Sequence, residues 1–168
     1  MTDLSALRRA KRPRTPLAGP YGHPFHAMLV TVPIGAWTGA IVFDLVSFFA
    51  DDPETFVRGA LWLVGIGVVG ALAAAVFGLL DLSILTPGTK ARRIALTHMA
   101  LNIAGIVLFA VSFLLRLNAP ADEPAIAGFV AALLGYAAVG ASGFLGGELT
   151  YRHGVRVADE ETQAEAHR

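Results

Sequence analysis

Five side chains with metal-binding chemistry lie beside or within long apolar stretches of the sequence. They are three histidines and two carboxylates: His23, His26, Asp81, His98 and Glu148. A neutral imidazole binds a metal ion or haem iron through a ring nitrogen, and a carboxylate binds harder cations through oxygen. Because titratable groups are costly at membrane depth unless they are paired or functional, these five are the candidate site residues.

The composition is typical of a membrane protein. The 168 residues are 55% hydrophobic and 15% charged, and the mean hydropathy is +0.60. Since the formal net charge is zero, no overall positive field favours nucleic acid as a partner. The chain has no cysteine, which excludes disulfides, thiolate metal sites and haem attached covalently through a CxxCH motif.

Four apolar runs are long enough to cross the lipid bilayer as helices. A bilayer core of roughly 30 Å requires about 20 helical residues. The runs cover residues 25–50, 57–80, 94–115 and 125–147. Because short connections make successive helices antiparallel, we expect an all-α, integral membrane four-helix antiparallel bundle with up-down-up-down order.

The basic residues predict how this bundle is oriented. Of the 13 lysines and arginines, only Arg58 and Arg116 lie beside one end of the four helices, and the remaining eleven lie beside the other end. Such an excess marks the cytoplasmic side. We therefore expect a basic cytoplasmic N-terminal tail (1–21), a transmembrane domain (22–157) and a polar, cytoplasmic C-terminal tail (158–168), in the bacterial inner (plasma) membrane.

Each of the four helices brings a polar group to this cytoplasmic end. His26 begins the first helix, Asp81 ends the second, and Glu148 follows the fourth. His98 enters with the third helix, and Asn102 lies one turn deeper on the same side. The topology therefore predicts one polar cluster at this end of the bundle.

Asp44 is predicted to lie at the opposite end. It follows His26 by 18 residues, which is roughly 27 Å along a helix that rises 1.5 Å per residue. An unpaired carboxylate is costly there, so we expect Asp44 to pair with Arg58 or Arg116.

One interpretation of the polar cluster is a b-type haem site. His26 and His98 would be the axial ligands, since the first and third helices are diagonal in a simple four-helix bundle. Asn102 lies beside this pair, and Arg93 and Arg152 would bind the haem propionates. The protein would then be an electron-transfer subunit of a membrane redox system.

Two other interpretations remain open from the residues alone. His23 or His26 together with Asp81, His98 and Glu148 offers the mixed nitrogen and oxygen ligands that suit a Zn²⁺, Fe²⁺ or Mn²⁺ ion. Alternatively, the same groups form a hydrogen-bond network in a non-catalytic membrane scaffold. The residue types do not decide between these three.

A glycine-rich motif lies inside the second apolar run. GIGVVG, residues 65–70, matches the G-x-G-x-x-G pattern, but no strand precedes it, so we do not expect a nucleotide site. We expect these glycines to permit close helix packing, as do the GxxxG pairs Gly35/Gly39 and Gly143/Gly147, which also make a homodimer plausible.

Four longer segments are similar to a known family. They are HPFHAMLVTVPIGAWTGAIVFDL, GLLDL, LTHMALN and FLGGELTYRHGVRV, within residues 22–157. They resemble the prokaryotic integral membrane family catalogued as domain of unknown function 2231. The family's first motif usually reads His-Pro-x-His-Pro, whereas this chain has Ala27 at the second proline, and Thr31 stands where some members carry a further histidine.

The resemblance implies a context and no specific activity, because the family has none established. Some relatives carry the same domain fused to Rieske-type ferredoxin or c-type cytochrome modules. The resemblance therefore implies membrane redox chemistry, with a Rieske or cytochrome c type protein as the redox partner.

Overall fold

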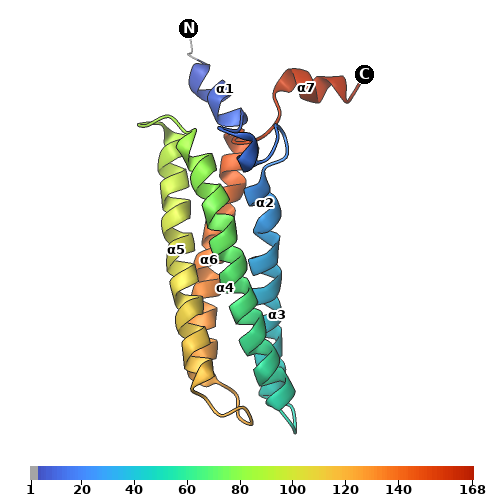
Figure 1. Cartoon of the computed structure of the whole chain (residues 1–168), viewed down its shortest axis with the longest axis vertical. Helices are drawn as coiled ribbons and strands as arrows, with labels where there is room; N and C mark the ends of the chain where they lie inside the picture. The colour runs from blue at the N-terminus through green and yellow to red at the C-terminus, as the bar shows by residue number, and fades with distance from the viewer. Residues whose placement is uncertain (1–3) are drawn as a thin grey trace.

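A computed structural model describes residues 4–168, and within that range every regular element is helical. Four helical spans are long and apolar enough to cross a membrane: Phe25–Ser47, Glu54–Ser83, Lys90–Leu117 and Ile126–Arg152. They run side by side as one elongated bundle, and both chain termini lie at the same end of it (Figure 1). The predicted all-α four-helix membrane bundle is confirmed.

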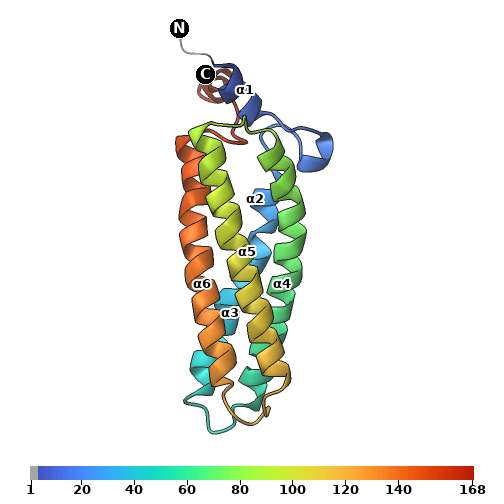
Figure 2. The same ribbon diagram turned by 90° about the vertical axis from the view of Figure 1, so that its left-hand side faces the viewer.

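The bundle consists of two closely packed helix pairs. Helix α3 (Thr31–Ser47) packs mainly on α4 (Glu54–Ser83), α5 (Lys90–Leu117) packs mainly on α6 (Ile126–Gly147), and α4 joins the pairs through α5. Figure 2 shows α4, α5 and α6 in front with α3 behind them. Helices α3 and α5 are therefore diagonal across the bundle.

The first span is interrupted one turn before Pro33. The short helix α2 (Phe25–Leu29) ends there, and α3 begins after Val30. Proline has no N–H to donate to the carbonyl four residues earlier, which is that of Leu29, so the helical ladder is weakened at this point. The Thr31 hydroxyl donates to the Met28 carbonyl at 2.7 Å and satisfies one group at the break.

The two diagonal helices meet in the middle of the bundle through a stacked aromatic pair. The rings of Trp37 on α3 and Phe109 on α5 have centroids 3.9 Å apart and planes within 5°. Glycines on both neighbouring helices make room for them, because an added Cβ would clash with Trp37 Nε1 at Gly67 and would lie 3.0 Å from the Phe109 ring at Gly135. The aromatic rings therefore leave no room for a side chain at Gly67 and little room at Gly135.

The GIGVVG segment is a packing surface, as the sequence predicts. Besides Gly67, an added Cβ would meet the Phe113 ring at 2.9 Å from Gly65 and Val32 at 2.8 Å from Gly70. The three glycines thus allow α4 to approach its neighbours.

A buried ion pair joins the diagonal helices at the end opposite the termini. Arg116 donates from both terminal nitrogens to the two carboxylate oxygens of Asp44, each at 2.6 Å. Its Nε donates to the Ser112 hydroxyl at 3.1 Å, and that hydroxyl donates to the Gly128 carbonyl at 2.6 Å. Of the two partners expected for Asp44, Arg116 is the one that pairs with it, whereas Arg58 pairs with Glu54 on the surface.

The segments outside the bundle lie together over its other end (Figure 1). They comprise α1 (Ser5–Lys11), the 3₁₀ turn η1 (Pro16–Ala18) and α7 (Glu160–Glu165). The π-helical turn η2 (Glu148–Arg152) continues α6 and ends the fourth span. Lys11 ties α1 to the C-terminal segment by donating to the Ala158 carbonyl at 3.3 Å and to the Glu160 carboxylate at 3.0 Å.

Candidate functional site

His26 and His98 approach each other inside the end of the bundle that carries the termini. Their ring centroids are 6.3 Å apart and their planes are nearly perpendicular, at 87°. His26 comes from α2 and His98 from the diagonal helix α5. The pair thus lies between two helices that do not otherwise pack closely.

The His26 ring is held against α4. Its Nδ1 lies 2.9 Å from the Ala74 carbonyl, which can only accept, so Nδ1 carries the proton in this bond. The ring packs over Gly78, where an added Cβ would lie 3.1 Å from the imidazole. Its second nitrogen, Nε2, makes no hydrogen bond within residues 4–168 and keeps a free electron pair.

The His98 ring is held against α6 in the same way. Its Nδ1 lies 2.8 Å from the Ser142 carbonyl and 2.9 Å from the Ser142 hydroxyl, which itself donates to the His98 carbonyl at 3.0 Å. An added Cβ at Gly146 would lie 3.1 Å from this ring. Unlike His26, His98 has a partner at Nε2, since the Asn102 amide lies 3.0 Å away.

Asp81 lies on α4 one turn beyond Gly78, and its partner is a residue that sequence reasoning did not single out. The Arg156 Nε lies 2.8 Å from Asp81 Oδ1. Arg156 is 4% exposed, and its Nη2 donates to the carbonyls of Ala18 and Gly19 at 2.8 and 3.2 Å. Asp81 therefore helps to fix the terminal segments above the histidine pair.

Glu148 and His23 also lie away from the histidine pair. Glu148 Oε1 is 3.6 Å from His153 Nε2 and 3.8 Å from an Arg152 nitrogen. His23 is exposed, with its Nδ1 3.3 Å from the Tyr21 carbonyl. Among the described residues, no three His, Cys, Asp or Glu side chains are grouped so as to hold a metal ion.

The two arginines expected near a haem lie on the surface. Arg93 donates to the Gly88 carbonyl at 3.3 Å, and the Arg152 side chain is 73% exposed beside Glu148. Of the sequence-predicted site residues, the structure therefore brings together His26, His98 and Asn102, and it places the others around this end of the bundle.

Sequence reasoning expected Gly146 to make room for a cofactor ring, but it missed Ala74, Gly78 and Ser142, which position the two imidazoles. Ala74 and Gly78 are four apart on α4, and Ser142 and Gly146 are four apart on α6, so each pair forms one patch on its helix. A small residue four before a glycine is a weak signal in a helix rich in alanine and glycine. Such a patch can be identified as a histidine contact only when the structure shows which imidazole packs against it.

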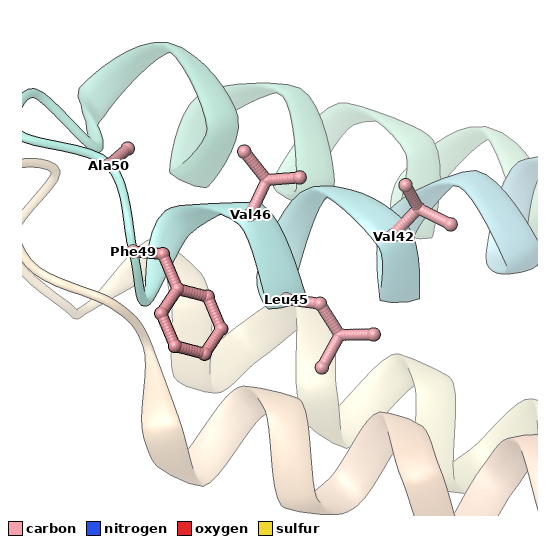
Figure 3. A pocket seen from close by; sticks show the side chains of 5 residues that line it. All are labelled: Val42, Leu45, Val46, Phe49 and Ala50. Atoms are coloured by element: carbon pink, nitrogen blue, oxygen red, sulfur yellow. The ribbon is translucent and has the colours of Figure 1, made fainter.

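A pocket at the far end of α3 has a different character. It is an open hollow of ≈ 400 Å³ lined by Val42, Leu45, Val46, Phe49 and Ala50 (Figure 3). These side chains are all apolar and offer no ligand for a metal or cofactor. Side chains on the lipid-facing surface of a membrane helix are likewise apolar.

Comparison with known proteins agrees with the fold. A family model described as "Predicted membrane protein (DUF2231)" matches residues 22–159, which include all four spans and both histidines of the pair. No curated protein and no solved structure matches the chain. Since the model covers most of the sequence, the chain belongs to the DUF2231 family of membrane proteins.

Proposed function

We propose that the protein is an electron-transfer subunit of a membrane redox system that binds a b-type haem between His26 and His98. The observation that carries the proposal is the approach of these two imidazoles across the bundle, 6.3 Å between ring centroids. The two histidines would hold the haem iron through one ring nitrogen each.

The hydrogen bonds of the pair support a role as ligands. Each ring directs Nδ1 to a backbone carbonyl, of Ala74 for His26 and of Ser142 for His98. Such a bond fixes the tautomer and leaves the Nε2 electron pair for iron. For His26 this nitrogen is free, whereas for His98 the Asn102 amide must turn away before a ligand can bind.

The charges around the pair are compatible with a haem. A free carboxylate would repel the haem propionates, but Asp81 is paired with Arg156. A bound haem would supply a one-electron carrier at this end of the bundle, and a Rieske or cytochrome c type protein would exchange electrons with it.

A structural network is the second candidate, and the Asn102 contact favours it. With Asn102 on Nε2 and Ser142 on Nδ1, the hydrogen-bonding nitrogens of His98 are both satisfied within the protein. His26 would then only join α2 to α4, and His98 would join α5 to α6. A metal ion held by carboxylates has less support, because Asp81 and Glu148 are engaged elsewhere.

An absorbance spectrum of the detergent-purified protein, expressed with a haem precursor, tests the proposal. We expect a Soret band that shifts on reduction, and we expect both His26→Ala and His98→Ala to abolish it. His23→Ala is the matched control, because His23 is exposed and should leave the band unchanged. A folded protein without a Soret band would contradict the proposal, and bound zinc, iron or manganese in the same sample would favour a metal site.

We also propose that both tails are cytoplasmic in the bacterial inner membrane, as the basic residues indicate. The chain has no cysteine, so single cysteines report the side of the membrane directly. In intact cells, an impermeant maleimide should label Asp52→Cys, in the loop before α4, and should not label Lys90→Cys at the start of α5. The reverse pattern would overturn the orientation.

A further inference from the structure

We propose that the outer face of α6, where it passes into η2, binds a membrane phospholipid, with Arg152 as the ligand of the lipid phosphate. A shallow pocket of ≈ 500 Å³ lies there, lined by Phe144, Gly147, Glu148, Tyr151 and Arg152. It is separate from the histidine pair, and the inference does not depend on the proposed haem.

The shape of the pocket favours a lipid over a soluble ligand. All the lining residues come from one continuous helical segment, so the pocket has a single wall and is open on the other side. A soluble ligand would keep most of its surface in contact with solvent. A lipid at the same place is held from the other side by the bilayer, since the pocket lies in the last turns of the span Ile126–Arg152.

The π-helical turn brings the polar and apolar parts of the pocket together. The His153 amide donates to the Glu148 carbonyl, five residues back, at 3.0 Å. Within this turn the Tyr151 ring lies beside Gly147, 3.9 Å from an added Cβ. Single π-helical turns within helices often occur at functional sites.

The guanidinium of Arg152 has unused hydrogen-bond donors. Its side chain is 73% exposed, and its contact with Glu148, 3.8 Å between nitrogen and oxygen, is too long for a hydrogen bond. Arg152 donates no hydrogen bond within residues 4–168. A guanidinium that is free on one side binds a phosphate through two parallel N–H donors.

The helix face below the pocket suits an acyl chain. At Gly143 and Gly140, one and two turns before Gly147, no atom lies within 4 Å of an added Cβ, so the surface there is open and flat. The exposed rings of Phe144 and Tyr151 stand beside this strip, 75% and 91% exposed. Tyrosine at the membrane interface lies at the level of the lipid headgroups, which is where Arg152 meets the phosphate.

We expect Glu148 to set the strength of this site, because it also lines the pocket and its carboxylate lies 3.8 Å from an Arg152 nitrogen. It repels a phosphate and competes with it for Arg152. We therefore expect Glu148→Gln to strengthen lipid binding, while Arg152→Gln weakens it by roughly tenfold or more, as for the loss of a charge-assisted bidentate contact.

Native mass spectrometry of the full chain, titrated with phosphatidylglycerol, measures this binding. The control is Arg58→Gln, since Arg58 forms a similar i,i+4 pair with Glu54 at the other end of the bundle. We expect Arg58→Gln to bind like the wild type, and Gly147→Leu, which fills the pocket, to bind as weakly as Arg152→Gln. Equal binding by Arg152→Gln and Arg58→Gln would overturn the proposal.

Two further ligands identify what is recognised. Diacylglycerol has the same acyl chains without the phosphate, and we expect it to bind weakly and equally to the wild type and to Arg152→Gln. Inorganic phosphate at millimolar concentration should not displace the lipid. Binding of diacylglycerol as tight as that of phosphatidylglycerol, or displacement by inorganic phosphate, would refute a phospholipid site.

Discussion

Asp44 and Arg116 form a bidentate ion pair across the diagonal of the bundle, with both nitrogen–oxygen distances at 2.6 Å. Each residue is 3% exposed, so neither charge is solvated by water. Removal of one partner leaves the other charge buried and unpaired, which typically costs about 3–5 kcal/mol. The pair therefore locks α3 to α5 at the end of the bundle opposite the histidines.

The first prediction concerns this ion pair. Arg116→Leu should lower the stability of the detergent-purified protein by about 3–5 kcal/mol, since it leaves the Asp44 carboxylate unpaired. The double variant Asp44→Leu/Arg116→Leu should lose less than the sum of the single variants, because no unpaired charge remains. Denaturant unfolding measures both. The control is Arg58→Ala, which removes an exposed ion pair and should change stability by at most about 1 kcal/mol. If Arg116→Leu lost no more stability than Arg58→Ala, the buried ion pair would not have the structural role assigned to it.

The second prediction concerns Gly67, which lies under the central tryptophan. An added Cβ would clash with Trp37 Nε1, so Gly67→Ala must displace the ring that stacks on Phe109. Overpacking of this kind costs about 1–3 kcal/mol. Gly35→Ala is the matched control, since no atom lies within 4 Å of its added Cβ, and it should be neutral or stabilising because alanine favours the helix. Thermal unfolding of the two variants, followed by tryptophan fluorescence, tests the difference.

The sequence predicts the spans and the end at which each polar group lies, because length and hydropathy determine both. Asp44 and Arg116 illustrate this, because counting residues along their two helices predicts that both lie at the same depth in the membrane. The rotation of each helix about its axis is not predictable in the same way. Helices that are apolar on all sides have no polar face to define the inside, so the contacts of His98 with Ser142 and of His26 with Ala74 could not be foreseen.

The contacts of the terminal segments could not be predicted from the sequence for a different reason. From the sequence, Arg156 is predicted to be one more cytoplasmic arginine. In the structure its backbone has a φ of 61°. Its guanidinium is buried against Asp81 and the carbonyls of Ala18 and Gly19. The contacts with the two carbonyls join segments more than 130 positions apart in the chain. No local pattern encodes such a contact.

The third prediction separates the two roles proposed for the histidine pair. Asn102→Leu removes the amide that lies 3.0 Å from His98 Nε2. If the pair binds haem, this nitrogen becomes available, and the variant should retain its Soret band and hold haem at least as tightly as the wild type. If the pair is only structural, a partly buried acceptor loses its partner, and the variant should lose about 1–3 kcal/mol of stability without any haem spectrum. Haem titration and denaturant unfolding of the same preparation distinguish the outcomes.

The last prediction concerns the pH dependence of the contact between the two tails. The hydrogen bond from Lys11 holds the pKa of Glu160 below its ordinary value, and the amide of Thr162 at the start of α7 does the same for Asp159. A carboxyl group whose pKa is lowered by folding stabilises the folded form above its unfolded pKa, about 4.3 for glutamate and 3.9 for aspartate, and this contribution disappears as the pH falls through the folded pKa. The docking of α7 on α1 should therefore be intact above about pH 5 and should weaken progressively below about pH 4.

Spin labels on two exposed positions, Arg9→Cys and Ala164→Cys, measure this docking directly, because the chain has no cysteine of its own. The distance between the labels should be narrowly distributed at neutral pH and should broaden in acid. Glu160→Gln should broaden the distribution already at pH 7, since the amide keeps no charge for Lys11, whereas Glu161→Gln should follow the wild type. A Glu160→Gln profile that matches the wild type at every pH would show that the Lys11 contact does not hold the two tails together.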